Sequence, residues 1–265
     1  MSAGRVRIEV DKLDKSFDLG ARALKVVDDV SFRIREGEFV ALLGPSGSGK
    51  STILNMIATL LPKSGGGIAI DGQPVVLNRP RRNVGYVFQK DTLFPWRTVA
   101  GNIGYALELA GVPPAERNER VEAAINAAGL KGFGTFYPTS LSGGMRQRVA
   151  LMRTLIMRPE ILLMDEPFGA LDTHTKLEMH EVLLKLWERE KQTVLFVTHD
   201  LGEALTLADR IILLSARPGR LKEDFVVPFA RPRNPVTLRE TAEYAALFSR
   251  IWHSLGEEFA KAVSP

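Results

Sequence analysis

The chain has 265 residues, room for one large domain or two small ones, and its 45% hydrophobic and 25% charged residues are typical of an ordinary soluble globular protein. It contains no cysteine, which excludes disulfide bonds, thiolate nucleophiles and cysteine-bound metals, and no apolar run approaches the ~18 residues needed to cross a bilayer. The net charge of +4 reflects scattered lysine and arginine without interleaved aromatics, so we expect no nucleic-acid partner.

The N-terminal part of the chain is predicted to be rich in β-strands. Residues 6–10 and residues 30–34 alternate between apolar and polar side chains, which is the pattern of half-buried strands. Asp28 and Asp29 lie between these segments and are typical turn formers. We therefore expect two strands separated by turns in this region.

A glycine-rich loop separates the next two predicted elements, a buried strand over the apolar residues 39–43 and a helix over residues 51–60. The loop matches the phosphate-binding pattern G-x-x-x-x-G-K-[ST]. Glycines let such a loop point its N–H groups at phosphates, the lysine adds a positive charge, and the serine hydroxyl suits Mg²⁺. A glycine-rich turn that binds nothing is the alternative, but the strand–loop–helix context favours a nucleoside triphosphate site. The predicted site comprises Gly44, Pro45, Ser46, Gly47, Ser48, Gly49, Lys50, Ser51 and Thr52.

Strands give way to helices in the middle of the chain and return afterwards. Residues 65–67 and 71–72 are expected to punctuate a short hairpin, because glycine and aspartate favour turns. The pattern predicts helices over residues 99–157, and beyond them strands and helices alternate as in parallel α/β units. We therefore expect an α-helical insertion over about residues 90–158 within an α/β core.

Two carboxylates follow the apolar residues 161–164, which predict a buried strand. Asp165 at the strand end is suited to hold Mg²⁺, directly or through water. Glu166 is suited to position or deprotonate an attacking water. A solvated turn is the alternative, but a chain that already carries a phosphate loop favours the chemical interpretation, because phosphoryl transfer needs one group for the metal and one for the water.

The C-terminal residues predict an amphipathic helix. Residues 231–235 read as a linker, and Thr237 with Glu240 offers a capping box. Apolar residues then recur at three- and four-residue spacing up to Phe259. The helix either docks on the main body of this chain or contacts a partner chain, and both interpretations stay open.

Residues 141–147, Leu-Ser-Gly-Gly-Met-Arg-Gln, resemble the LSGGQ signature of the ABC-transporter ATPases. The resemblance implies that Ser142, Gly143 and Gly144 close over the γ-phosphate of ATP held by the other protomer of a homodimer. Met145 departs from the glutamine that the family most often has. A plain helix N-cap at Ser142 is the alternative.

The same resemblance assigns four further residues. It implies that Gln89 contacts Mg²⁺ and the attacking water, that Asp172 lies across the dimer interface, and that His199 holds the γ-phosphate and Glu166. Phe17 would stack on adenine. Packing in the core is the alternative for His199 and Phe17. The other histidines, His174, His180 and His253, read as surface or packing residues.

Residues 89–99 and 214–220 resemble the nitrate/sulfonate/taurine branch of bacterial ABC importers. In that branch the ATPase is a separate subunit that works on the cytoplasmic face of the membrane with an integral permease and a solute-binding protein. The resemblance implies that Leu93, Phe94, Pro95 and Trp96 lie near the groove for the permease. Packing between the two subdomains is the alternative.

The expected fold is α/β, a P-loop NTPase (RecA-like) core with an N-terminal antiparallel β-subdomain and an inserted α-helical subdomain. We expect an ATPase domain over residues 1–220 and a C-terminal extension over residues 221–265. The predicted function is ATP binding and hydrolysis, with Mg²⁺, that powers solute uptake. An exporter or lipid-transport ATPase, a non-transport ABC protein and a nucleotide-binding regulator without turnover are the alternatives.

Overall fold

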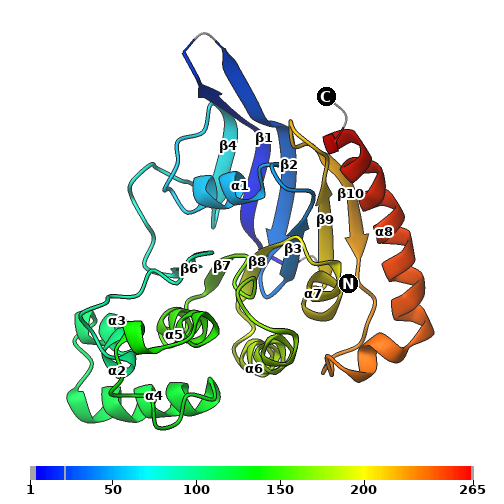
Figure 1. The fold of residues 1–265 in the computed structure, drawn as a ribbon. Coiled ribbons are helices and arrows are strands. Elements are labelled where there is room, and N and C mark those ends of the chain that lie inside the picture. The colour runs from blue at the N-terminus through cyan, green and yellow to red at the C-terminus, as the bar shows by residue number, and fades with distance from the viewer. Residues whose placement is uncertain (1–3, 21, 264–265) are drawn as a thin grey trace.

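Two β-sheets organise the chain in the computed structural model, which describes residues 4–20 and 22–263 (Figure 1). The smaller sheet is antiparallel, with the order β2-β1-β4-β5. The larger sheet has six strands in the order β10-β9-β3-β8-β7-β6. The strands of the smaller sheet are β1 (Val6–Asp18), β2 (Ala23–Arg35), β4 (Gly65–Ile70) and β5 (Gln73–Pro74).

The larger sheet is parallel except for the edge strand β10, which pairs antiparallel with β9. Its central strands are buried on both faces, which explains their unbroken apolar sequences. Because the carboxyl ends of parallel strands meet at one edge, the loops after β3, β7 and β8 converge there. The strands are β3 (Phe39–Leu43), β6 (Val84–Val87), β7 (Ile161–Asp165), β8 (Thr193–Thr198), β9 (Arg210–Leu214) and β10 (Leu221–Val226).

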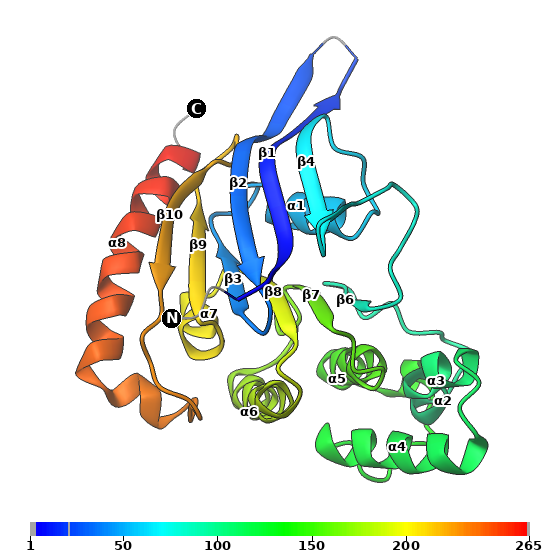
Figure 2. The same ribbon diagram turned by 180° about the vertical axis from the view of Figure 1, so that it is seen from behind.

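Helices cover the sheets in two groups. Helix α1 (Lys50–Ile57) shares an apolar core with the antiparallel sheet, and α6 (Thr173–Glu190) and α7 (Leu201–Leu207) belong to a second core on the other face of the parallel sheet. Four helices between β6 and β7 gather at one end of the molecule, away from the antiparallel sheet (Figure 2). They are α2 (Val99–Ile103), α3 (Tyr105–Leu109), α4 (Pro114–Ala127) and α5 (Gly143–Leu155).

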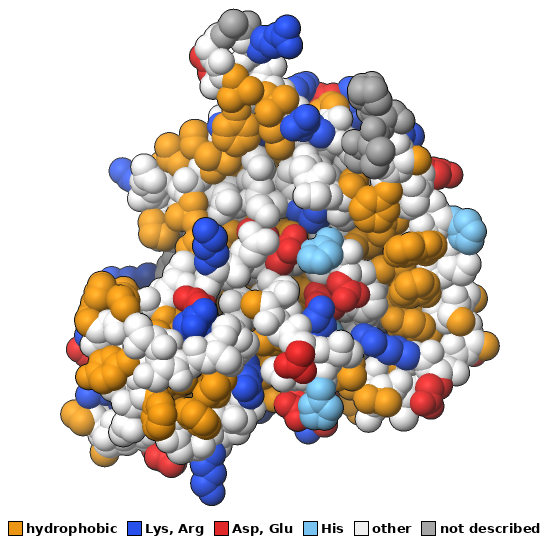
Figure 3. Space-filling view, in the orientation of Figure 1, with side chains coloured by type: hydrophobic (Ala, Val, Ile, Leu, Met, Phe, Trp, Pro, Cys, Tyr) orange, Lys and Arg blue, Asp and Glu red, His pale blue; other side chains and the backbone are white. Residues whose placement is uncertain are grey.

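The C-terminal helix α8 (Ala242–Val263) docks beside β10 (Figure 1). Lys222 Nζ on β10 donates to Ser254 O at 2.8 Å, and Glu258 accepts from the Ala216 N–H at 2.9 Å. Tyr244, Phe248 and Trp252 stack along one side of the helix, with ring centroids 6.1 and 6.0 Å apart. Hydrophobic side chains are visible over α8 on the face shown in Figure 3. None of the helices that the structure describes combines the length and apolar character needed to cross a membrane.

The structure corrects three local predictions. Asp28 and Asp29 lie inside β2 instead of in a turn, and Asp28 is held there by Arg220 and Lys25. Residues 65–67 belong to β4, where Gly66 at φ 74° allows close approach to β1, since a Cβ would lie 2.1 Å from Lys12 O.

The prediction that the C-terminal helix begins near Thr237 is also wrong. Residues Thr237–Glu240 form a short 3₁₀ turn, and α8 begins only at Ala242. The hydroxyl that caps α8 belongs to Thr241, whose Oγ1 accepts from the Tyr244 N–H at 3.2 Å.

Candidate functional site

The loop between β3 and α1 is the expected phosphate cradle, and two glycines shape its backbone. Gly47 and Gly49 have φ of 79° and 86°, the left-handed region that glycine adopts without strain. A Cβ on Gly49 would lie 2.9 Å from Val27 Cγ2, whereas a Cβ on Gly47 would meet nothing within 4 Å. Gly49 is therefore packed against β2, and Gly47 faces open space where a ligand can approach the backbone. The N-terminus of α1 follows directly, so its dipole favours an anion here.

Lys50 brings a positive charge to this cradle. Its Nζ donates to Gly44 O and Pro45 O, both at 2.9 Å, and is 3.4 Å from Ser48 Oγ. Burial lowers the pKa of Lys50, and the nearby carboxylates Glu166 and Asp165 oppose that effect. A buried ammonium beside a glycine loop suits a phosphate group, which would bind it as a direct counter-charge.

Ser51 and Asp165 meet at the bottom of the site. Ser51 Oγ donates to Asp165 Oδ1 at 2.8 Å. Burial raises the pKa of Asp165, the Ser51 hydrogen bond opposes it, and the charge of Glu166 adds to it. Within residues 4–20 and 22–263 no three acidic or histidine side chains form a cage for a metal ion. A hydroxyl and one carboxylate nevertheless fit Mg²⁺, which proteins usually hold with few side chains plus substrate phosphates.

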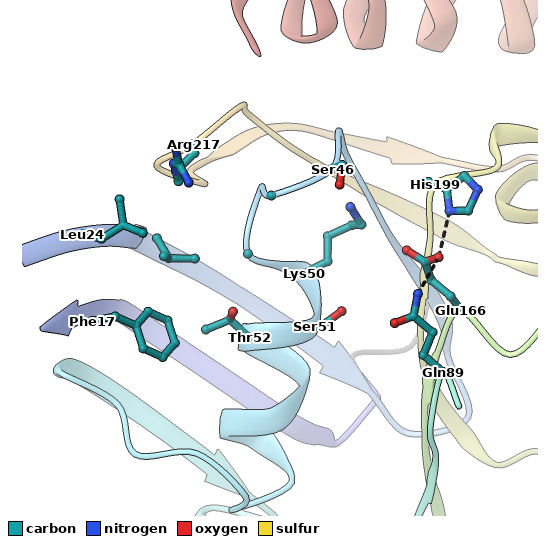
Figure 4. Close-up of a pocket in the computed structure, with 13 residues that line it drawn as sticks. Phe17, Leu24, Ser46, Lys50, Ser51, Thr52, Gln89, Glu166, His199 and Arg217 are labelled. Carbon is teal, nitrogen blue, oxygen red and sulfur yellow. Dashed lines mark hydrogen bonds and ion pairs between the residues drawn. The ribbon is translucent and has the colours of Figure 1, made fainter. Parts of the chain in front are cut away.

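Glu166 is the centre of a polar cluster at the carboxyl ends of the parallel strands. It has φ 45°, a conformation uncommon for residues other than glycine. Its Oε2 lies 2.9 Å from His199 Nδ1, after β8, and 3.4 Å from Gln89 Nε2, after β6 (Figure 4). Because the carboxylate accepts, Gln89 and His199 fix its orientation. The arrangement suits a base that holds a water molecule in a chosen direction.

These groups open into one cleft of about 710 Å³. Glu166, His199 and Gln89 lie at one end of the cleft, and Phe17 and Leu24 lie at the other end (Figure 4). Phe17 and Leu24 are register partners on β1 and β2, and Lys15 Nζ lies 4.8 Å from the Phe17 ring. The lining residues are Phe17, Leu24, Val26, Ser46, Gly47, Gly49, Lys50, Ser51, Thr52, Gln89, Glu166, His199 and Arg217.

Three lining residues were not among the sequence-predicted site residues, namely Leu24, Val26 and Arg217. Leu24 and Val26 could have been found from their alternation on a strand that pairs with the strand of Phe17. Arg217 lies within residues 214–220, which resemble the importer branch but carry no pattern that predicts a contact with the cleft. It reaches the cleft from the loop between β9 and β10.

The second glycine-rich segment does not reach this cleft within the described chain. Ser142 Oγ accepts from the Met145 N–H at 3.3 Å and caps α5. Asp172 Oδ1 accepts from the His174 and Thr175 N–H groups, both at 3.1 Å, and caps α6. Ser142 and Gly143 are exposed, and Gly144 is half-buried.

A family model described as "ABC transporter" matches residues 27–169, a range that begins in β2 and extends past Glu166. The chain belongs to the ABC transporter family. An ABC transporter ATP-binding protein of Methanocaldococcus jannaschii is 43% identical over 98% of this chain and 95% of that protein. A taurine import ATP-binding protein of Rhizobium johnstonii is 44% identical over 87% and 88%. An aliphatic sulfonates import ATP-binding protein of Bacillus cereus is 40% identical over 88% and 92%.

A solved ATP-binding cassette also resembles the structure. It is a dimer in a post-hydrolysis state with ADP and phosphate, and it matches with a TM-score of 0.75 and 33% identity over 84% of this chain and 100% of that chain. The predicted fold class is therefore confirmed. The prediction of an ATP-binding ABC transporter ATPase is confirmed as well.

Proposed function

We propose that this chain is the ATP-hydrolysing subunit of a bacterial ABC importer and powers uptake of a small solute of the nitrate, sulfonate or taurine type. It works as a homodimer with two ATP–Mg²⁺, and a separate integral permease with its own solute-binding protein carries the solute. The observation that carries the chemistry is the cluster of Glu166, His199 and Gln89 beside the phosphate cradle. The importers named among its relatives support the physiological role.

The proposal gives a role to each sequence-predicted residue that lines the cleft. Residues 44–52 bind the phosphates, with Lys50 as the cation, and Phe17 stacks on the adenine. Ser51, Asp165 and Gln89 hold Mg²⁺, which neutralises phosphate charge when it is bound. Glu166 takes the proton of the attacking water, and His199 orients Glu166 and faces the γ-phosphate. Ser142, Gly143, Gly144 and Asp172 of the second protomer close the site.

Replacing the base tests the chemistry. Glu166→Gln keeps the shape of the side chain and still accepts a hydrogen bond, so we expect normal ATP binding. Hydrolysis should fall by roughly 100-fold or more, because a positioned base contributes about that factor. Glu178→Gln on the exposed face of α6 is the matched control and should hydrolyse ATP normally. Wild-type turnover in Glu166→Gln would refute the assignment of the base.

A surface beside helices α2 and α3 supports a permease partner. Trp96 is 71% exposed, and its ring lies 5.5 Å from that of Phe94. Phe94 also lines a groove of about 440 Å³ with Tyr105 and Met157. Buried Asn102 holds this segment rigid, because its amide accepts from the Phe94 N–H at 2.8 Å and donates to Phe94 O at 3.1 Å. Leu93, by contrast, packs against the core. A rigid aromatic cluster beside a groove suits the docking of a helix end.

The division of the chain follows the same proposal. Residues 1–220 form the ATPase domain, with the helical segment of about residues 90–158 next to the permease, and residues 221–265 form an extension. The subunit is peripheral on the cytoplasmic face of the cell membrane, because only there would ATP and the permease meet.

Affinity purification from native membranes tests the importer role. We expect a multi-span permease and a solute-binding protein to accompany the wild-type chain. Trp96→Ala should no longer bind the permease but should keep the ATPase activity of the isolated subunit. The control Trp252→Ala, which removes an exposed tryptophan from α8, should still bind the permease. Recovery of ribosomes, DNA or an export-type membrane protein instead would overturn the importer assignment and leave the ATPase chemistry in place.

A further inference from the structure

Arg217 is a cation on the wall of the nucleotide cleft that the proposed mechanism does not use. It lies at the end of the cleft that holds Phe17 and Leu24, far from Glu166 and His199 (Figure 4). The side chain is exposed. Among the residues that the structure describes, none forms a hydrogen bond or ion pair with its guanidinium. Arg220, three residues later, is in contrast paired with Asp28 through its Nε at 2.7 Å. An unpaired guanidinium that faces a site for an anion is available for a ligand.

The loop that carries Arg217 is fixed by the elements on either side of the cleft. Gly219 N–H donates to Val26 O at 2.9 Å, and Gly219 O accepts from the Asp28 N–H at 3.0 Å, which ties the loop to β2. Gly219 also packs closely against the phosphate loop, since a Cβ there would lie 1.9 Å from Ser48 O. Any displacement of this loop would therefore move Arg217 relative to the phosphate cradle.

The C-terminal helix fixes the loop from outside the cleft. Glu258, 1% exposed, accepts from the Ala216 N–H at 2.9 Å, immediately before Arg217. The same carboxylate lies 2.9 Å from Lys222 Nζ and 2.7 Å from Lys261 Nζ. A buried carboxylate held by two lysines is a rigid anchor for the backbone amide. The neighbouring Glu257 also binds Lys222, at 2.6 Å, but it is 67% exposed and does not bind the loop.

We propose that Arg217 binds the part of the nucleotide that ATP and ADP share, and that Glu258 of α8 is the positioning residue that holds Arg217 there. The guanidinium lies at the nucleoside end of the cleft, where it can donate to the α-phosphate or ribose or lie against the base. The C-terminal helix thereby becomes part of nucleotide recognition, although no side chain of α8 lines the cleft.

Titration calorimetry with ATP and with ADP tests the role of Arg217. We expect Arg217→Ala to weaken both nucleotides by the same factor, about threefold to tenfold, because an exposed guanidinium contributes roughly that much. Its KM for ATP should rise while kcat stays within about twofold of wild type. If Arg217→Ala has unchanged affinity for both nucleotides, or loses affinity for ATP alone, the proposal that Arg217 contacts the part that ATP and ADP share is overturned.

A double-variant cycle tests the role of Glu258. Glu258→Ala should weaken both nucleotides as Arg217→Ala does, and the double variant should be no weaker than Arg217→Ala alone, since Glu258 acts through Arg217. Glu258→Gln, which still accepts the Ala216 amide, should bind nearly normally, and Glu257→Ala is the matched control with wild-type affinity. Additive losses in the double variant would overturn the positioning role.

Two further arms keep the result unambiguous. If Glu258→Ala does not fold, as judged by its thermal unfolding, Glu258→Asp replaces it in the cycle, because its shorter side chain keeps the charge near Lys222 and misses the Ala216 amide. The inference rests on nucleotide binding in the proposed function. A wild-type chain that binds neither nucleotide would refute that function, whereas wild-type affinity in Arg217→Ala refutes only the inference.

Discussion

At the scale of single residues, glycine is required where the loop between β9 and β10 crosses the phosphate loop. A Cβ on Gly219 would lie 1.9 Å from Ser48 O, a backbone atom that cannot rotate away as a side chain could. We expect Gly219→Ala to lower the free energy of unfolding by about 1–3 kcal/mol, the usual cost of overpacking. ATP affinity should fall too, because the displaced atom belongs to the phosphate cradle. Urea unfolding and ATP titration measure both effects.

Gly256 on α8 is the matched control for that substitution. A Cβ there would meet nothing within 4 Å, and the residue lies in the interior of a helix. Gly256→Ala should therefore raise the free energy of unfolding by roughly 0.5–1 kcal/mol through helix propensity and leave ATP affinity unchanged. A Gly219→Ala protein as stable as the wild type would contradict the close packing at the crossing.

Some residues of the site can be predicted from a short contiguous motif, and others cannot. The phosphate loop and the pair Asp165-Glu166 are contiguous patterns beside an apolar strand, so the sequence alone predicts where they lie. Arg217 lies in a contiguous segment too, residues 214–220, but the resemblance of that segment to the importer branch predicts no contact with the cleft. Its place in the cleft depends on the contact of Gly219 with Ser48, and the packing of two loops so far apart along the chain leaves no periodic trace.

At the scale of the elements, α6 carries a buried histidine that makes the fold sensitive to acid. His180 is fully buried with its ring 4.7 Å from that of Phe168, and neither ring nitrogen has a hydrogen-bond partner among the described residues. Burial, with smaller effects of Arg239 and Lys176, lowers the pKa of His180 to about 3 from an ordinary 6.5. The unfolded chain therefore binds a proton between these pH values and the folded chain does not, so stability is lost as the pH falls below 6.5.

The expected size of this effect follows from the separation of pH and pKa. At pH 5 the protonation of His180 in the unfolded state costs the fold about 2 kcal/mol, at 1.36 kcal/mol per pH unit below 6.5. His180→Leu should remove that part of the difference in unfolding free energy between pH 7.5 and pH 5. His174→Gln, an exposed position on the same helix, should leave the profile as it is. Equal profiles in His180→Leu and wild type would refute the assignment.

The boundaries of the elements show where local patterns fail. Apolar runs predict β3 and β7 well, because a parallel strand buried on both faces needs apolar side chains at every position. Asp28 resembles a turn residue, yet ion pairs with Lys25 and Arg220 hold it inside β2. Likewise Thr237 and Thr241 both offer a capping hydroxyl, and only the packing of α8 selects the second.

At the scale of the whole molecule, the loops after β3, β7 and β8 lie together at the carboxyl ends of the parallel strands. The start of α5 does not line the cleft that they form. The cleft thus brings Glu166, Lys50 and the glycine-rich loop between β3 and α1 together within one chain. Ser142 and Gly143 are exposed and do not line that cleft. A second copy that brings these residues over the cleft would complete the site, and the solved relative is described as a dimer with ADP and phosphate.

A charge placed at Gly143 tests this assembly. A Cβ there would meet only the tip of Arg146 at 3.9 Å, and a carboxylate in the first turn of α5 suits the helix dipole, so Gly143→Glu should fold normally. In a Glu166→Gln background that retains ATP, the added charge would face the γ-phosphate of the second copy. We expect ATP binding to the monomer to persist while sedimentation shows that the ATP-dependent dimer is lost. Ala115→Glu, which adds the same charge to the exposed first turn of α4, should dimerise normally, and a Gly143→Glu protein that dimerises equally well would exclude α5 from the interface.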